Sequence, residues 1–453
     1  MQNKSNTFTS RFGMIAATIG SAIGLGNVWR FPAETQANGG AAFLIIYILC
    51  VLLLGIPVMI GEFSLGKGGG SDSIGIYKNL SPKTKWWITG SIGLLASYII
   101  LAFYIVVAGW TLEYLFYSLT GDLYSATDSL TGEALFQEKM GEYIGTPVRP
   151  LVFTYIIIFA NLAILVMGVQ KGIEKVSSIL MPVLFLVLIA FIIYTLRLPK
   201  ASEGLKFFLS PDFSKINLSV IINAMGQAFF SLSLGMGVLT TYASYFPKNT
   251  NLTKTAITVS MLDLIVAFMM GLIIFPAVAS FGLENQTFEG ATLVFVTLPE
   301  VFENMDGGQV WSCLFFLLLL VAAITSTISI AEVAIAFFRD RFRMNRIKAC
   351  LLVIVPLLFF SALCSLSLTP GSPLTLFEKT LFDNADNLAT NILLPTGAFF
   401  MCIYLGWFSP KGFFKNQVES NSRIGTIVFP LLRFIIKFVA PPIIFVILIS
   451  GLF

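Results

Sequence analysis

The sequence contains no histidine and only five cysteines. Without histidine, Ser-His-Asp and Cys-His catalysis and histidine-based zinc sites are excluded. The cysteines are scattered through apolar segments without a Cys-x-x-Cys pair, which is typical of small buried residues. No HExxH or GxSxG motif occurs, so we do not expect an enzyme.

Charge is also scarce. Charged residues make up 11% of the 453 positions, whereas a soluble domain has about 25%. The net charge of +4 provides no strongly basic face, and we therefore expect no nucleic-acid partner. Hydrophobic residues instead account for 56% of the chain, including 43 phenylalanines, and the mean hydropathy is +0.86. This composition predicts a multi-pass protein whose main partner is the lipid bilayer.

Eleven segments of about 20 or more largely apolar residues are long enough to cross a bilayer as helices. They cover residues 11–37, 41–66, 86–118, 150–169, 175–196, 217–245, 255–281, 309–338, 346–367, 386–408 and 428–452. We expect an all-α membrane protein with one domain over residues 1–453. Most of the 28 Lys and Arg residues lie on the inner side if the N-terminus is cytoplasmic. This arrangement predicts a cell-membrane protein with an extracellular C-terminus.

Two of these segments are poor helices. Gly20, Gly24 and Gly26 fall within the first span, where each glycine costs about 1 kcal/mol relative to alanine. A similar stretch, from Ser231 to Gly237, interrupts the sixth span. Backbone groups that lose their helical bonds in hydrocarbon must find other partners. Unwound carbonyls are natural cation ligands, and free N–H groups are natural anion ligands.

The two interrupted spans open two blocks of five spans, at residues 11–197 and 216–408. Because each block has an odd number of spans, the second block must be inverted relative to the first. Residues 428–452 then form an extra helix outside the repeat. Paired interrupted helices in inverted halves indicate a transporter binding site.

Polar residues at membrane depth are functional candidates. Asn27 follows the first break, Asp263 lies in the middle of the seventh span, and Thr325, Ser326 and Thr327 lie in the eighth. Oxygen-only donors with a single carboxylate suit sodium. The alternatives are a helix cap for Asn27, a hydrogen-bonded or protonated Asp263, and hydroxyls that bond to the preceding turn.

Other residues suggest gates at the two ends of the path. Arg30 and Asp386 would lie on the outer side and could close over a central site, or they could form an ordinary interfacial ion pair. Gly172 and Pro182 lie near the start of the fifth span. They predict an inner end that can unwind, or else a routine proline kink.

Several motifs resemble those of the neurotransmitter:sodium symporter family, particularly its prokaryotic branch, and the resemblance covers nearly the whole chain. They are Gly20-Ser-Ala-Ile-Gly-Leu-Gly-Asn-Val-Trp-Arg-Phe-Pro32, Asn38-Gly39-Gly40, Gly226-Gln227-Ala-Phe-Phe-Ser-Leu-Ser-Leu-Gly235 and Thr241-Tyr-Ala-Ser-Tyr245. The resemblance implies alternating access, two sodium ions, a hydrophobic amino-acid substrate and no obligatory protein partner.

The resemblance also implies where the ligands bind. The first sodium site would use the Ala22 carbonyl, Asn27, Ser231, Asp263 and the substrate carboxylate. The second would use carbonyls of Gly20, Ile23 and Ala322 with the hydroxyls of Thr325 and Ser326. The substrate would contact the unwound segments and an apolar pocket, at Ala22, Leu25, Gly26, Tyr104, Phe230, Ser231, Ser233, Met236, Ser326 and Ile330, with Ile100 nearby.

Three departures from the family pattern refine this expectation. Gly24 stands where amine-carrying relatives have Asp, which favours a substrate that brings its own carboxylate. Ala267 stands where many prokaryotic members have Glu, so Asp263 would supply the negative charge and chloride would not be required. The N-terminal Arg of the usual inner gate is absent, which leaves Lys4 and Asp340 as the candidate pair. Tyr104 and Phe230 would cover the loaded site.

The predicted function is sodium-coupled symport of neutral hydrophobic L-amino acids, aliphatic and aromatic. The alternatives are a proton-coupled amino-acid transporter, since Asp263 could titrate, and a cation channel. Glu62 is expected to brace the break in the sixth span. No role is assigned to Glu332.

Overall fold

The computed structural model describes residues 7–125, 132–283 and 290–452. Within these residues, nine helices are long and apolar enough to cross a membrane, and a bent pair provides a tenth candidate span. The nine are α3–α4 (Ala41–Gly69), α6 (Trp87–Thr120), α8 (Val148–Val166), α9 with its π-helical start (Val169–Thr195), α13 (Leu252–Phe281), α16 (Gly308–Arg341), α17 (Arg346–Ser367), α18–α19 (Leu381–Phe408) and α21–α22 (Arg423–Ser450). The predicted all-α membrane fold is thereby confirmed.

The remaining predicted spans are the two with glycine-rich breaks. The bent pair consists of α1 (Arg11–Ala22) and the segment Gly26–Ala37, which ends in α2 (Phe31–Ala37), and its halves meet at 55°. The sixth predicted span contains α11 (Leu218–Ser231) and α12 (Val238–Ser244), which are separated by irregular backbone. Helical winding therefore stops in both spans where the sequence predicted.

Polar caps explain where several helices begin. The side chain of Ser10 accepts a hydrogen bond from the Gly13 amide at the start of α1. Asn217, Asn251 and Asn345 cap α11, α13 and α17 in the same way. Each cap satisfies an amide that has no partner within its helix.

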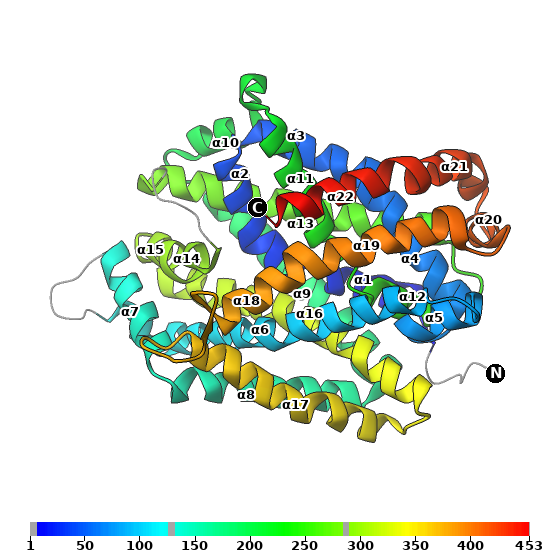
Figure 1. The fold of residues 1–453 in the computed structure, drawn as a ribbon. Coiled ribbons are helices and arrows are strands. Elements are labelled where there is room, and N and C mark those ends of the chain that lie inside the picture. The colour runs from blue at the N-terminus through cyan, green and yellow to red at the C-terminus, as the bar shows by residue number, and fades with distance from the viewer. Residues whose placement is uncertain (1–6, 126–131, 284–289, 453) are drawn as a thin grey trace.

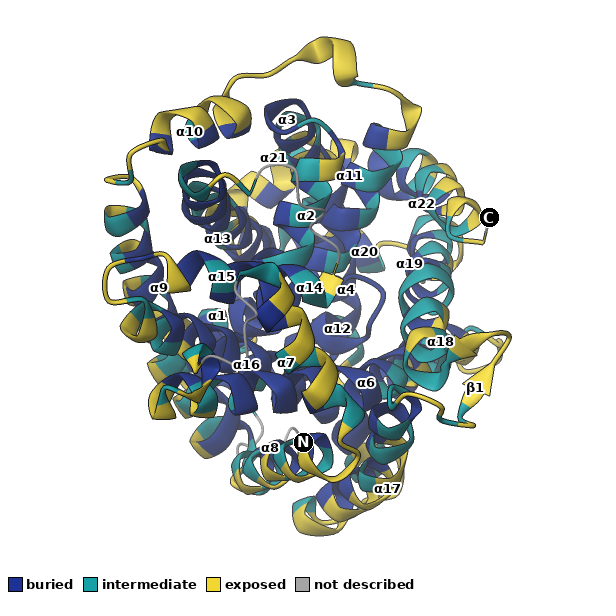
Figure 2. Cartoon of the chain, turned by 90° about the vertical axis from the view of Figure 1, so that its left-hand side faces the viewer, coloured by how far each residue is buried: buried dark blue, intermediate teal, exposed yellow. Residues whose placement is uncertain are grey.

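The longest helices occupy the centre of the molecule. Helices α6 and α16 lie side by side along their lengths (Figure 1). In the most apolar stretches of α6, α13 and α16, 72% of the residues are buried, compared with 33% in α8 and α9. Figure 2 shows buried residues gathered at the centre and exposed residues on the outer helices.

The outer surfaces of the peripheral helices are apolar. Exposed large side chains include Phe159 on α8, Leu186 on α9 and Phe359 on α17. Such faces suit lipid, because hydrocarbon solvates them without cost whereas water does not.

Short elements occupy the connections. They are α5 (Ser73–Leu80), α7 (Glu133–Gly145), α10 (Ala201–Leu209), α14 (Gly290–Thr292), α15 (Leu298–Glu303), α20 (Phe413–Glu419) and the antiparallel pair β1 (Thr375–Leu376) and β2 (Lys379–Thr380). Helix α10 packs against α13, and α5 packs against α6, so these connections extend the framework of long helices.

Candidate functional site

The first break lies between Ala22 and Gly26. Helix α1 ends at Ala22, and Ile23 adopts an extended conformation with φ −69° and ψ 113°. The chain resumes at Gly26 as a π-helical turn that continues into α2. Carbonyls at the end of α1 and amides at the start of the second half are thereby released from helical bonding.

The second break contains residues in left-handed conformations. Ser233, Gly235 and Gly237 have φ values of 54°, 82° and 76°. A Cβ on Gly235 would lie 2.4 Å from the Leu394 carbonyl oxygen, so only glycine fits at this position. The Gly235 amide donates to Glu62 Oε1 at 2.6 Å, which confirms that Glu62 braces this break.

The two breaks are bonded to each other. Ser233 Oγ donates to the Ser21 carbonyl at 2.9 Å, and Gln227 Nε2 donates to the Gly26 carbonyl at 3.0 Å. These four residues are buried. Segments about 200 residues apart therefore form one polar region inside an apolar protein.

A cluster of polar side chains lies beside this region. Asp263 on α13 accepts from Asn27 Nδ2 at 2.9 Å and from Ser231 Oγ at 2.7 Å. The hydroxyl of Tyr47 donates to Ser231 Oγ at 3.3 Å. Among the described residues, no lysine or arginine forms an ion pair with Asp263. The cluster thus places a carboxylate without a cationic partner at the centre of the membrane region.

The Asn27 side chain lies between the first break and Asp263. Its Oδ1 accepts from the Gly24 amide at 3.3 Å, inside the break, and no side chain caps the second half-helix. The bond to Gly24 satisfies an amide just before the second half-helix, so a capping role and an ion-ligand role both stay predictions for Asn27. Its Nδ2 donates to Asp263, so its Oδ1 points into the break and keeps a second lone pair for a ligand.

The second predicted ion site is also brought together. Ser326 Oγ on α16 lies 3.3 Å from the Gly20 carbonyl and 3.2 Å from the Ile23 carbonyl. The hydroxyl of the adjacent Thr325 lies 3.1 Å from the Ala322 carbonyl, so it also bonds to its own helix, as one alternative proposed. Thr327 contributes nothing here, because its hydroxyl donates to Asn161 on α8.

Tyr104 lies at the first break. Its hydroxyl accepts from the Leu25 amide at 3.0 Å. A Cβ on Gly24 would lie 2.6 Å from this hydroxyl and 2.8 Å from Ser326 Oγ. The glycine therefore leaves space at the point where Tyr104, Ser326 and the Leu25 amide converge.

A cavity of about 670 Å³ reaches this point, and Leu25, Tyr104 and Phe230 line it together with Arg30 and Asp386. The predicted apolar pocket residues Met236, Ile330 and Ile100 are buried, and so is Ala22. The Phe230 ring packs against Gly26, where a Cβ would lie 3.0 Å away. Tyr104 and Phe230 line this cavity, whereas Met236, Ile330 and Ile100 do not, and the covering role of Tyr104 and Phe230 stays a prediction.

The predicted ion pair between Arg30 and Asp386 is not formed. Arg30 instead lies 3.8 Å from Glu34, one turn along its own helix, and its guanidinium stacks on the Phe230 ring at 4.5 Å. Both Arg30 and Asp386 line the cavity.

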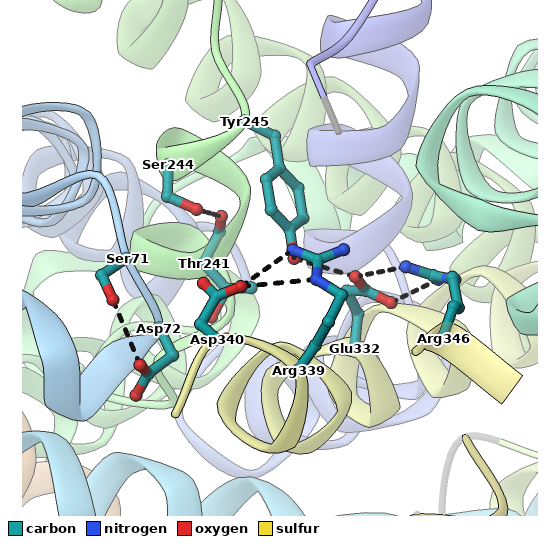
Figure 3. Close-up of polar contacts among 9 residues, drawn as sticks. All are labelled: Ser71, Asp72, Thr241, Ser244, Tyr245, Glu332, Arg339, Asp340 and Arg346. Atoms are coloured by element: carbon teal, nitrogen blue, oxygen red, sulfur yellow. Dashed lines mark hydrogen bonds and ion pairs between the residues drawn. The ribbon is translucent and has the colours of Figure 1, made fainter. Parts of the chain in front are cut away.

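The opposite end of the site is closed by an ionic network (Figure 3). Glu332 on α16 is fully buried and receives two hydrogen bonds from Arg346, at 2.7 and 3.0 Å, and one from Tyr245 at 2.9 Å. Asp340 pairs with the adjacent Arg339 at 3.3 Å, and Lys4 lies outside the described residues. The sequence analysis did not predict that Glu332 pairs with Arg346. A signal was present, because Arg346 is the first residue of α17, the helix that follows α16.

The start of the fifth span is wound in this structure. Gly172 lies in a π-helical turn, Val169–Glu174, and a Cβ there would lie 2.1 Å from the Ile164 carbonyl oxygen. Pro182 lies inside α9, which continues to Thr195. Gly172 therefore permits a close approach to the end of α8, and Pro182 does not end the helix.

This fold, with two facing breaks and oxygen donors between them, defines a membrane transporter. The profile of the Sodium:neurotransmitter symporter family matches residues 5–139 and 137–453, and the chain belongs to that family. It is a transporter of a sodium-dependent family and not an enzyme.

Individual proteins of known sequence or structure are similar to this chain over nearly its whole length. An uncharacterized sodium-dependent transporter, YhdH of Bacillus subtilis, is 36% identical over 97% of this chain and 96% of its own. An uncharacterized sodium-dependent transporter of Haemophilus influenzae is 35% identical over 99% of this chain and 98% of its own. The crystal structure of MhsT in complex with L-phenylalanine matches with a TM-score of 0.88 and 38% identity, over 98% of this chain and 99% of that one.

Proposed function

We propose that the protein couples the entry of sodium to the uptake of neutral hydrophobic L-amino acids by alternating access in the cell membrane. One observation carries this proposal. A buried carboxylate, Asp263, and backbone amides near Leu25 that lie outside regular helix are found within one site that opens into a cavity. The carboxylate attracts a cation and the amides attract an anion, so the site suits an alkali ion beside a zwitterion.

Two sodium ions are expected to accompany the substrate. Asp263, Asn27 and Ser231 would bind the first ion, and the carbonyls of Gly20 and Ile23 with Ser326 would bind the second. All of these donors are oxygen atoms, which hard monovalent cations prefer. The substrate carboxylate would complete the first site, so that ion and substrate each raise the affinity of the other.

The pocket favours an apolar side chain. Met236, Ile330 and Ile100 are buried apolar residues, and none of them could pair with a charged substrate group. Methionine adapts to side chains of different shape. The similarity to a transporter that was crystallised with L-phenylalanine supports aromatic as well as aliphatic substrates.

Chloride is not expected to be required. Asp263 provides a fixed negative charge close to the first ion site, and it has no cationic partner among the described residues. A diffusible anion would therefore add a second negative charge where one already compensates the ion.

The test is uptake of labelled leucine and phenylalanine into proteoliposomes that contain the purified protein. We expect accumulation when sodium is outside, none when choline replaces sodium at constant pH, and no loss when gluconate replaces chloride. Competition by unlabelled Trp or Ile should be strong, and competition by Asp, Lys or Arg should be absent.

Three results would contradict the proposal. Uptake driven equally well in choline by a proton gradient would indicate proton coupling. Sodium flux without substrate, with large unitary currents, would indicate a channel. Equal competition by lysine and leucine would refute the apolar pocket.

A further inference from the structure

The carboxylate of Glu174 binds both residues that precede α1. The Thr9 amide donates to Oε2 at 2.9 Å, and the Thr9 hydroxyl donates to Oε1 at 2.8 Å. The amide and the hydroxyl of Ser10 both donate to Oε1 at 2.9 Å. Glu174 is only 5% exposed and ends the π-helical turn at the start of the fifth span. One buried side chain therefore joins the beginnings of the first and fifth spans.

The neighbouring sequence makes room for this carboxylate. A Cβ on Gly13 would lie 2.3 Å from Glu174 Cγ, so any side chain at position 13 would displace Glu174. Ser10 Oγ, which donates to Glu174, also accepts from the Gly13 amide and caps α1. The cap and the carboxylate thus form one continuous chain of hydrogen bonds.

The Glu174 carboxylate has its polar partners within this contact. Among the described residues, it forms no ion pair with a lysine or arginine. Its compensation comes from the four hydrogen bonds and from the positive end of the α1 dipole. A buried carboxylate that lost these partners would have to move toward water.

The segment before α1, residues 7–10, is held from the other side as well. The Phe8 amide donates to the Tyr245 carbonyl at 3.0 Å, and the Phe8 ring packs on Tyr242 and Tyr245 at centroid distances of 5.8 and 6.4 Å. Gln170 Nε2 donates to the Thr7 carbonyl at 2.8 Å. Residues 7–10 therefore fill the space between the end of α12 and the start of the fifth span.

We propose that Glu174 is a positioning residue that latches α1 to the fifth span and keeps the cytoplasmic path closed. Inward opening requires the latch to release, which frees α1 to swing and the turn Val169–Glu174 to unwind in the same step. A π-helical turn is suited to this role, because such turns are less regular than α-helix and recur at functional sites. The inference rests on the proposed alternating access and adds the residue that couples the two movements.

Hydrogen exchange of the full-length protein, read by mass spectrometry without substrate, tests the latch. Glu174→Gln removes the charge and one acceptor at nearly constant volume. We expect exchange at the Thr9 and Ser10 amides and in residues 169–174 to become about tenfold faster in choline. Glu419→Gln is the matched control, because Glu419 pairs only with Lys415 at the partly exposed end of α20.

Sodium separates a latch from a merely structural contact. An ion at the carbonyls of Gly20 and Ile23 ties α1 to α16, so saturating sodium should return exchange in Glu174→Gln to within about twofold of the unmodified protein. Exchange that stays fast in sodium, or that never changes, would overturn the proposal.

A second pair of variants tests the space at Gly13. Gly13→Ala should speed exchange in choline as Glu174→Gln does, because its methyl group displaces the carboxylate. In a Glu174→Ala background the same substitution should add less than twofold, since the obstruction is gone. Independent effects of the two substitutions would refute the latch. Because no amino acid is present in these assays, a failed uptake experiment would count against the substrate proposal and leave the latch result standing.

Discussion

Replacement of Asp263 by asparagine is the most direct test of how the site balances charge. The substitution keeps the shape of the side chain but removes the negative charge from a fully buried position. It also leaves Ser231 Oγ, now 2.7 Å from Oδ2, facing either an amide nitrogen or a weaker acceptor. We therefore expect weaker binding of sodium at the first site.

The size of the effect follows from electrostatics. A cation about 3 Å from a carboxylate gains roughly 5 kcal/mol at an effective dielectric constant of about 20. The amide oxygen of asparagine restores part of this energy as a dipole, so a loss of about 2 to 3 kcal/mol is expected. That loss corresponds to a sodium affinity roughly 30- to 150-fold lower.

The assay is sodium-dependent uptake into proteoliposomes, with the half-saturating sodium concentration measured in chloride and in gluconate. The Asp263→Asn protein should be more active in chloride, because a mobile anion can replace the lost charge. The original protein should not distinguish the two salts. Asp212→Asn is the control, since Asp212 lies in an exposed turn before α11 and caps only Ser214. An unchanged sodium dependence with no response to chloride would refute the reasoning.

Three further substitutions address other parts of the structure. Gly24→Asp should abolish leucine uptake without unfolding the protein, because the new side chain would collide with Tyr104 and Ser326. Retained uptake would show that the substrate does not use the space beside Gly24. Ser326→Ala should raise the half-saturating sodium concentration by about tenfold, because the loss of one oxygen ligand costs about 1.4 kcal/mol. An unchanged concentration in the same uptake assay would exclude this hydroxyl from the ion site. Glu332→Gln should lower the free energy of unfolding by about 2 to 3 kcal/mol, because it leaves the half-buried Arg346 without its counter-ion, and partial exposure reduces the cost below that of a fully buried charge. Adding Arg346→Met should recover part of that loss in a melting experiment, and no recovery would mean that the pair is not the cause.

The membrane class, the span positions and the two breaks could be predicted from the chain alone. Apolar length is a local property, and it must match the thickness of the hydrocarbon core whatever the tertiary packing. The breaks are local as well, since glycines such as Gly24 and Gly235 weaken a helix wherever it lies. Asp263 was identifiable because a lone carboxylate in an apolar run is costly.

Hydrogen bonds and ion pairs between segments far apart in the chain could not be predicted from the sequence. The oxygens of Glu332 and Glu174 are satisfied by groups on distant segments of the chain, which only packing brings within 3 Å. The expected pair of Arg30 and Asp386 is not among the ion pairs of the described residues, and Arg30 pairs with Glu34 instead. The chain's composition and glycine positions determined the spans and where they break. Tertiary packing alone decided which buried charge meets which partner, because hydrogen bonds act over a few ångströms while Asn27 and Asp263, for example, lie 236 residues apart.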